Sequence, residues 1–486
     1  MSAKCILLVL GVSASVACGT DSTDAAAPLL VGDEDGGASE IPSGCDVKAS
    51  PYEALACNVD SYVVYVSPKG DDSGSGTKSA PKKTIGSALS ASGVKRPRVY
   101  VCAGDYVERV EISEGVMVVG GWDCEKWTSG GETKVAPTER GVALRVTDVK
   151  SDVSIWGIHF ASQDGAEAGE SSVCASVSNS TNVSFTAVSL SAGKGVDGAK
   201  GADGAAGKVG EKGNDASGAT PGAAKSVMCE WGTSTGGAGG GVKAKGGDGS
   251  SVPMTTTVMG RDGAGGAGYE TATSTPCVGG KAGSDGAARQ AGQGASVVGT
   301  TSQGWVPSPG SVGEAGNPGQ GGGGGGGGET DASGSGGVGG CGGNGGEGGA
   351  AGGGSIALLS VNSTTTLASV SLRTSGAGGG ASGGTGGAGG GGGGGGTTGG
   401  CGGGRAGNGA GGAGGGGGAG GISVGIVYAG VAPKKSEVTF SLGLAGAAGE
   451  GGKGGAGGSN SLSTAPSGPD GTAGIAGVAA ETYEIK

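Results

Sequence analysis

Arg145, Asp148, Asp152 and Asp164 are the residues of this chain whose types and spacing come nearest to a catalytic set. A glycoside hydrolase needs two facing carboxylates, and a pectate-type lyase needs a calcium-binding acid cluster with a basic residue. These four residues could therefore act on an acidic polysaccharide. The three acids also fall near expected turns, where Asp is favoured for ordinary hydrogen-bonding reasons. We expect that structural role and no catalytic residues.

Other common catalytic and cofactor-binding sites lack their residues in this chain. His159 is the only histidine, so a Ser-His-Asp triad would depend on it alone. It lies between Ile158 and Phe160, and alternation along a strand turns it to the opposite side, outward. Zinc is disfavoured because no two cysteines have C-x₂-C spacing. The glycine strings match a dinucleotide fingerprint by composition alone, and no phosphate-binding loop occurs. We expect no metal and no cofactor.

The first eighteen residues have an export pattern, in which Lys4 and the apolar run CILLVLGV precede the small residues Ser15, Val16 and Ala17. The run is too short to span a bilayer. The ending resembles a bacterial lipobox, which implies that Cys18 is acylated and becomes the new N-terminus. Ser15 departs from that pattern, since the family usually has Leu there. Simple cleavage after Ala17 is the alternative.

Nine cysteines follow Cys18, and in an exported protein they indicate disulfides with one thiol left over. Spacing does not fix the connectivity. Cys341 and Cys401 lie near matching depths of two successive glycine loops, so we expect a bond between them. Cys174 is our expectation for the free thiol, buried on a coil face. The remaining expected pairs are Cys229–Cys277 in an earlier loop, and Cys45–Cys57 and Cys102–Cys124 in the N-terminal part.

The 126 glycines are concentrated after Ala192. Glycine loses more backbone entropy on folding than any other residue and offers no side chain to bury. Such a chain is disordered unless a rigid element organises it. The formal net charge of −11 provides no basic footprint for a phosphate backbone, so we expect no nucleic-acid partner.

Residues 45–192 contain enough apolar side chains for a core. An alternating strand over 62–66 precedes a polar turn and a short helix signal, in which Ile85 and Leu89 are four apart. The elements YVSPKGDD, GT, AP, KTI, AL, VYVCAGDYVE and VVGGW occur in this order over about 62–127. This series resembles the opening of pectate-lyase-like right-handed β-helix proteins. The resemblance implies an N-terminal cap followed by parallel coils, and it implies no activity.

Three later segments share a pattern and begin at Ser172, Ser355 and Ser423. Each holds two short strands separated by a polar turn, and a glycine tract follows each one. A repeat that cannot bury its face alone must stack on its neighbours. We therefore expect coils of one continuing β-helix, with glycine loops that emerge from the same corner.

Within these loops glycine occupies every third position, over 195–213, 334–352, 380–395 and 443–458. Three residues is the period of polyproline II, in which one face must lack side chains for close lateral packing. We expect antiparallel polyproline II strands held by backbone N–H···O and Cα–H···O contacts. Plain flexible coil is the alternative. A collagen triple helix is disfavoured because proline is missing from these tracts.

The sequence thus predicts an all-β protein, a right-handed parallel β-helix with long glycine-rich, polyproline II-like loop insertions. Its expected parts are a signal peptide with lipobox (1–18), an acidic disordered tether (19–44), the β-helix cap and first coils (45–192), and glycine-rich loops alternating with further coils (193–486).

We expect a non-catalytic, lipid-anchored protein of the bacterial cell envelope, at the outer membrane or cell surface. It would act in surface structure, adhesion or matrix binding. Its expected partners are the membrane, through the acyl anchor, and a polysaccharide or other surface matrix. Two alternatives stay open. One is a carbohydrate-active β-helix enzyme, a polysaccharide lyase or hydrolase, and the other is a polyproline II layer that binds ice or polysaccharide.

Overall fold

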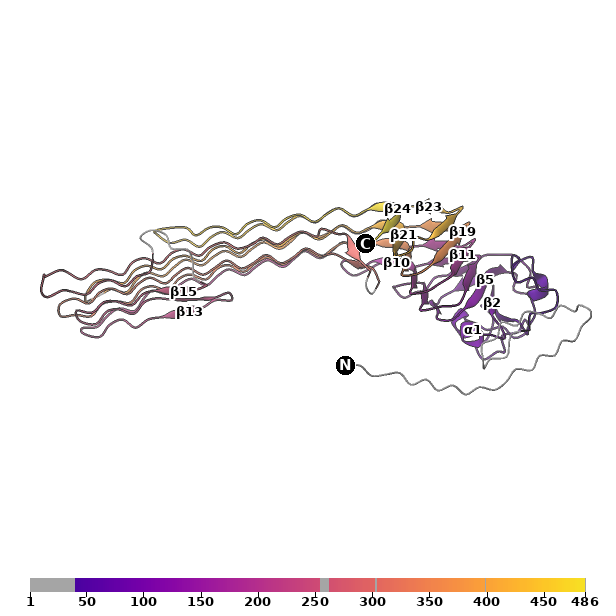
Figure 1. The fold of residues 1–486 in the computed structure, drawn as a ribbon, viewed down its shortest axis with the longest axis horizontal. Coiled ribbons are helices and arrows are strands. Elements are labelled where there is room, and N and C mark those ends of the chain that lie inside the picture. Colours follow the sequence, from indigo (N-terminus) through magenta and orange to yellow (C-terminus); the bar gives the residue numbers. More distant parts are fainter. Residues whose placement is uncertain (1–39, 254–261, 302–303, 398, 486) are drawn as a thin grey trace, which may run out of the picture.

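The computed structural model describes residues 40–253, 262–301, 304–397 and 399–485. The expected signal peptide, Cys18 and most of the expected tether lie outside these residues. Figure 1 shows a head of short strands at one end and a long bundle of extended chain that projects from it.

Almost all regular structure in the head is β-strand, arranged in three parallel sheets. The first sheet contains β1 (Val63–Val66), β2 (Arg98–Cys102), β5 (Val116–Trp122), β8 (Val153–Trp156), β11 (Val183–Thr186), β19 (Thr365–Ala368) and β22 (Lys434–Ser436). The second contains β4 (Val110–Ile112), β7 (Leu144–Thr147), β10 (Ser172–Ser178), β18 (Ser355–Val361), β21 (Ser423–Ala429) and β24 (Ala479–Glu484). The third contains β3 (Gly104–Tyr106), β6 (Thr133–Val135), β9 (Ile158–Ala161), β12 (Ser189–Ser191), β20 (Ser371–Arg373) and β23 (Thr439–Ser441).

The chain visits the three sheets in turn. Strands β7, β8 and β9 lie in different sheets, and β10, β11 and β12 repeat that order one position further along each sheet. The three segments that share a sequence pattern stack as expected, because Ser172 pairs with Ser355 and Ser355 pairs with Ser423. The protein is therefore all-β with parallel sheets, an arrangement compatible with a β-helix-like fold.

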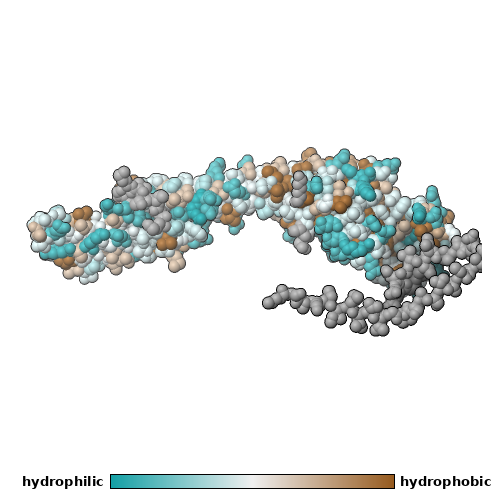
Figure 2. Space-filling model, in the orientation of Figure 1, coloured by the Kyte–Doolittle hydropathy of each residue, from teal (hydrophilic) through white to brown (hydrophobic). Residues whose placement is uncertain are grey.

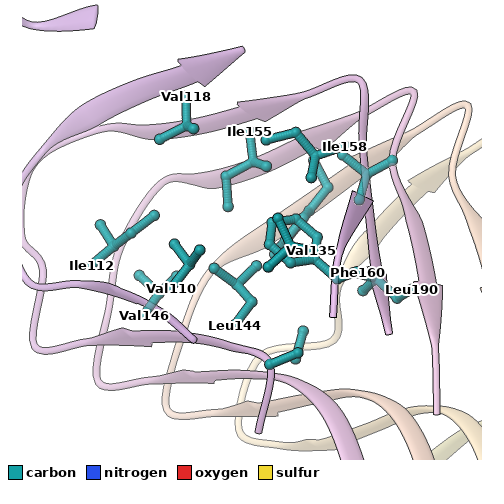
Figure 3. Close-up of a cluster of buried hydrophobic side chains, with 14 of the residues drawn as sticks. Val110, Ile112, Val118, Val135, Leu144, Val146, Ile155, Ile158, Phe160 and Leu190 are labelled. Atoms are coloured by element: carbon teal, nitrogen blue, oxygen red, sulfur yellow. The ribbon is translucent and has the colours of Figure 1, made fainter. Parts of the chain in front are cut away.

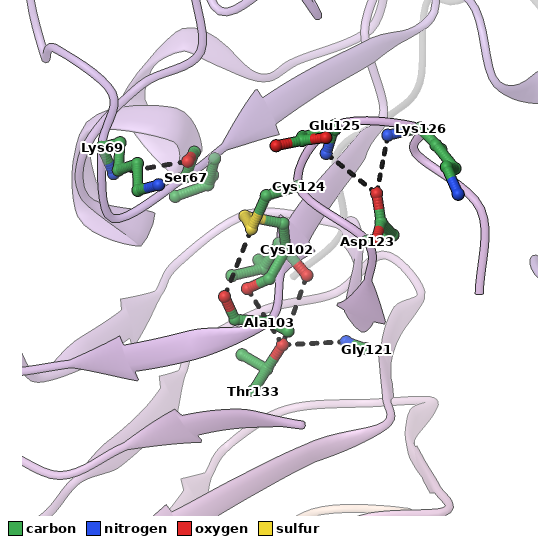
Figure 4. Close-up of a disulfide and its surroundings, with 12 residues drawn as sticks. Ser67, Lys69, Cys102, Ala103, Gly121, Asp123, Cys124, Glu125, Lys126 and Thr133 are labelled. Atoms are coloured by element: carbon green, nitrogen blue, oxygen red, sulfur yellow. Dashed lines mark hydrogen bonds between the residues drawn. A yellow bond between two sulfur atoms is a disulfide. The ribbon is translucent and has the colours of Figure 1, made fainter. Parts of the chain in front are cut away.

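The N-terminal part closes the first end of this stack. It holds the short helix α1 (Ile85–Ala91), which confirms the helix signal in the sequence, and the 3-10 turn η1 (Leu55–Cys57). Two disulfides, Cys45–Cys57 and Cys102–Cys124, are those expected from the sequence. Figure 4 shows the second of them, beside the Thr133 hydroxyl that accepts a hydrogen bond from the Gly121 amide at 2.8 Å.

In strands with one solvent-facing side, the core side chains alternate with exposed ones. In β7 the side chains of Leu144 and Val146 are buried, whereas Arg145 between them is exposed. Figure 3 shows Leu144, Val146, Ile155 and other apolar side chains meeting in the space that the strands enclose. Burial of each such side chain contributes roughly 1.5–3 kcal/mol, so the coils supply the stability that the glycine tracts lack.

The glycine tracts leave the third sheet and return to the second. Residues 193–216, 374–397 and 442–458 follow β12, β20 and β23, and residues 333–354, 403–422 and 464–478 lead back into β18, β21 and β24. A small three-stranded antiparallel sheet lies on the bundle, and a two-stranded hairpin lies near the head. They comprise β13 (Ser226–Met228), β14 (Thr233–Thr235) and β15 (Ser250–Val252), and β16 (Gly299–Thr300) and β17 (Val306–Pro307).

The hydrogen-bond register of the sheet continues into the tracts. Ser191 is paired with Arg373 in the sheet. Beyond them the Gly195 amide donates to the Gly376 carbonyl at 3.0 Å, and the same bond recurs three residues later between Gly198 and Gly379. The repeat has therefore changed from two residues to three, which is the period predicted for polyproline II.

The expected antiparallel contacts are present, but they are only half of the arrangement. Outgoing and returning tracts bond antiparallel, as when the Gly353 amide donates to Val196 and the Ala350 amide donates to Ala199. Tracts that run in the same direction bond parallel, as Gly195 and Gly376 do. The parallel bonds follow from the stacked coils, which place successive outgoing tracts side by side.

Glycine is required in the tracts for space and not for backbone freedom. Gly195, Gly201 and Gly207 do not have φ in the left-handed region. A Cβ atom at these positions would overlap the carbonyl oxygens of Gly353, Glu347 and Cys341 in the tract that lies against them. One face of the outgoing tract 193–216 is covered in this way, and that tract has glycine at one position in three.

Tracts with more neighbours have more glycine. In 333–354, Gly340 faces the backbone of Gly390 and Gly339 faces that of Gly319, so two positions of each triplet are glycine. Residues 409–421 have neighbours on all sides and are Gly or Ala throughout. Across these three tracts, the glycine content rises with the extent to which neighbouring backbone covers the tract.

Two further disulfides correct our expectation for the loop cysteines. The structure joins Cys229 to Cys341 and Cys277 to Cys401, so the expected pairs Cys341–Cys401 and Cys229–Cys277 are wrong. The Gly340 amide donates to the Gly407 carbonyl, so Cys341 lies level with residues beyond Cys401. The bonds span 112 and 124 residues, and each stabilises by roughly 4–5 kcal/mol in chain-entropy terms.

A pair of adjacent glycines tests the space requirement. A Cβ at Gly393 would overlap the Glu211 carbonyl oxygen, whereas a Cβ at Gly394 would meet no atom within 4 Å. We expect Gly393→Ala to lower the free energy of unfolding by about 1–3 kcal/mol through overpacking. Gly394→Ala should leave it unchanged or raise it by up to about 1 kcal/mol. Denaturant midpoints of the exported chain measure both, and equal midpoints for the two variants would contradict this packing of the tracts.

Candidate binding groove

A groove of about 630 Å³ lies on the outer face of the second sheet. Strands β7, β10 and β18 form its floor. Trp305 and Pro307, from the hairpin of β16 and β17, line one side of it. Trp305 also packs against an apolar cluster on this face, which includes Val173 and Leu359.

The floor changes from polar to apolar along its length. Strand pairing places Arg145, Ser176 and Leu359 in one row across the three strands, and Thr147 and Ser178 lie in the next row. The spacing between strands is about 4.8 Å, so each row extends roughly 10 Å. Hydroxyl groups beside apolar side chains suit a ligand that also has both, such as a pyranose ring.

Two of the four catalytic candidates line this groove. Arg145 and Asp148 are both exposed there, and within the described ranges neither side chain makes an ion pair or a side-chain hydrogen bond. An exposed charge without a partner in the protein is available to a ligand. Arg145 faces outward because its neighbours Leu144 and Val146 are buried in the core.

Asp148 also has the structural role that the sequence suggested. It has a positive φ of 57°, and Asn179 and Asn362 have φ of 50° and 49° at the same bend in the next two coils. Gly430, with φ of 93°, continues the row. Asp, Asn and Gly tolerate this left-handed conformation better than other residues, so a single residue turns the chain between sheets.

The other candidates lie elsewhere. Asp152 borders a different, shallower hollow beside β5, together with Met117. Asp164 follows β9, and its carboxylate accepts a hydrogen bond from the Lys194 amide at 2.7 Å. The structure therefore brings together Arg145 and Asp148 and does not add the other two acids to their groove.

His159 faces outward, as its position between two apolar residues predicted. It is half exposed, and its Nδ1 atom lies 3.0 Å from a carboxylate oxygen of Glu132.

Cys174 is the free buried thiol, as expected from the sequence. Burial raises its pKa to about 12, so the thiol stays protonated and is a poor nucleophile near neutral pH.

Sequence reasoning missed the Trp305 side of the groove. Trp305 lies in a glycine-poor interruption between two tracts, and that local change in composition was the available signal.

Across the described ranges, no three His, Cys, Asp or Glu side chains are grouped to hold a metal ion. No helix in the described part of the chain is long and apolar enough to cross a bilayer.

No protein-family model matches this chain, and no curated protein or solved structure gives a significant match. The resemblance to pectate-lyase-like proteins therefore depends on the motif series alone, and the parallel sheets are compatible with it.

Substitutions at Asp148 separate its two roles. We expect Asp148→Asn and Asp148→Gly to retain the unfolding midpoint, because both residues accept the left-handed bend. Asp148→Val should lower the free energy of unfolding by roughly 1–2 kcal/mol, since its branched Cβ is strained there. Urea titrations measure these differences. A Val variant as stable as the Gly variant would show that the bend does not constrain this position.

Proposed function

We propose that this chain is a non-catalytic, lipid-anchored protein of the bacterial cell envelope, at the outer membrane or cell surface. It acts there in surface structure, adhesion or matrix binding. Its head is a right-handed parallel β-helix of the pectate-lyase-like type, and its glycine tracts form a projecting polyproline II bundle.

The observation that carries this proposal is the ordered bundle itself. Backbone fills its interior, as the Gly340 and Gly409 positions illustrate, so it provides length and rigidity. The visible face of the bundle is mostly of intermediate hydropathy, with separate hydrophilic and hydrophobic spots (Figure 2). A rigid, water-compatible rod suits the display of surfaces at a distance from the head.

The expected acyl anchor at Cys18 agrees with this geometry. Cys18 precedes the expected tether, which is followed in sequence by the N-terminal cap, and the bundle projects from the later strands of the head. A protein anchored at that end would present its bundle away from the cap. Two or three acyl chains hold firmly, because each buried methylene contributes about 0.8 kcal/mol.

Replacing Cys18 tests the anchor. In a bacterial host that processes lipoproteins, the wild-type chain should incorporate labelled palmitate and remain in the envelope fraction. Cys18→Ala should lose the label and enter the soluble fraction. Cys5→Ala is the matched control, because Cys5 lies within the apolar run and should not be the acylated residue. A labelled Cys18→Ala variant, or a wild-type chain recovered only from the cytoplasm, would refute the anchor.

The groove favours a polysaccharide as the matrix component. The hydroxyl groups of its floor, its apolar side and the charges of Arg145 and Asp148 provide the contacts that a sugar chain uses. The enzyme alternative places catalysis in the same groove, with Arg145 and Asp148 as its groups.

Affinity electrophoresis in gels that contain polygalacturonate or a neutral β-glucan tests this candidate. Arg145→Ala and the space-filling Ser178→Tyr should reduce retardation by at least threefold. Arg373→Ala, which removes an exposed arginine from the third sheet, should not change it. Equal retardation of all variants would exclude the groove. Release of unsaturated uronates that Asp148→Asn abolishes would instead support the lyase alternative.

A further inference from the structure

A short hairpin on the bundle holds an exposed indole in a fixed position. Residues 229–232 connect β13 to β14 and include Trp231, a residue that is 47% exposed. Trp122 and Trp127, by contrast, are buried in the cap. Trp231 belongs to none of the buried apolar clusters, so core packing does not account for it.

Three contacts fix this hairpin on the tracts beneath it. Cys229 forms a disulfide with Cys341, and the Glu230 carboxylate accepts a hydrogen bond from the Asn344 side-chain amide. The Arg289 guanidinium lies over the Trp231 ring, 4.3 Å from its centre. An aromatic side chain held in this way loses little conformational entropy when it binds a partner.

Arg289 is itself held in place. It forms an ion pair of 3.0 Å with Glu314, and the Gln290 amide donates to the other Glu314 oxygen at 3.1 Å. The positive charge of Arg289 is thus matched by Glu314, and Glu230, the residue before Trp231 in the chain, adds a negative charge to the hairpin. These three charges sum to a net negative charge, which disfavours an anionic ligand and favours a neutral one.

The neighbouring surface offers hydroxyl groups. Met228 and Thr233 are paired across β13 and β14, and Met228 is 78% exposed. Two pairs further along the same strands, the hydroxyls of Ser226 and Thr235 bond to each other at 2.8 Å. Roughly 100 Å² of the Trp231 surface is open, if its exposed fraction of 47% is applied to the 150–250 Å² that an aromatic side chain can bury. A specific protein interface needs about 800 Å² on each partner, so a small partner is favoured.

We propose that the Trp231 hairpin binds a neutral pyranose chain, with a sugar ring stacked on the open surface of the indole. Axial C–H bonds of a pyranose carry partial positive charge and pack on the negative face of an aromatic ring. The hydroxyls of Ser226 and Thr235 lie on the adjacent strands for hydrogen bonds. This inference rests on the proposed matrix-binding function and gives it a second site, apart from the groove in the head.

Two sites on one rigid molecule would strengthen attachment to a long polysaccharide. Once one site has bound, the second binds as an intramolecular event with a high effective concentration. The rod keeps the two sites at a set separation, so a chain long enough to reach both is retained better than a short oligosaccharide.

Titration of the exported full-length chain with cellohexaose and chitohexaose tests the site, with tryptophan fluorescence and calorimetry as readouts. We expect at least one of these neutral hexasaccharides to bind. Trp231→Ala should weaken that binding about tenfold or more, as truncation of a binding anchor does. Trp231→Phe should stay within about threefold of wild type, because it retains a stacking face. Val209→Ala, at a 70% exposed position of the outgoing tract, is the matched control and should bind normally.

Each outcome decides the inference. Normal binding by Trp231→Ala, with binding lost in Arg145→Ala, would overturn it and leave the groove as the matrix site. No binding of either hexasaccharide, or stronger binding of polygalacturonate that depends on Trp231, would overturn it as well. Failure of the Cys18 experiment would refute the anchored function without affecting a positive titration. Disulfide mapping and circular dichroism confirm that each variant is folded.

Discussion

The structure depends on the N–H···O bond between parallel neighbours, which continues without interruption from the sheets into the glycine tracts. Ser191 and Arg373 are paired in a sheet, and Gly195 and Gly376 are bonded just beyond. The apolar core of the coils fixes the spacing, direction and register of both chain segments. A glycine tract alone has no side chains to bury and loses much entropy on ordering. In this protein each tract starts with its register already set by the strand before it.

The sequence predicted most of the head, because its signals are local or repeated. Alternation identified the buried faces of strands such as Leu144–Thr147, and the shared pattern after Ser172, Ser355 and Ser423 identified coils that do stack. The three-residue spacing of glycine likewise predicted close lateral packing. These features are properties of one strand or of one repeat, so a single sequence contains them.

The features that the sequence did not predict depend on which tracts are neighbours. Cys341 bonds to Cys229 because the Trp231 hairpin lies over the tract that contains Cys341. No rule of sequence spacing indicates this contact. The groove likewise needs Trp305 to lie over the same sheet face as Arg145, which is far from it in sequence. Of the four catalytic candidates, only Arg145 and Asp148 come together, since the bend at Asp148 places it at the edge of the same sheet face. Lateral order in the bundle is set by the whole fold.

The period of the tract bonds has a consequence for how such a protein can change its reach. An outgoing tract and its returning partner can each gain or lose one triplet while every remaining bond stays in step. Polyproline II advances about 3.1 Å per residue, so one triplet alters the projection by about 9 Å. The last pair of tracts is shorter than the pair before it. Ala456 lies level with Gly389 and the chain turns back soon afterwards, whereas the preceding outgoing tract continues to residue 397. Insertion or deletion of one triplet, nine nucleotides of coding sequence, in both tracts of a pair would thus lengthen or shorten that pair by one fixed step. The head would keep its structure.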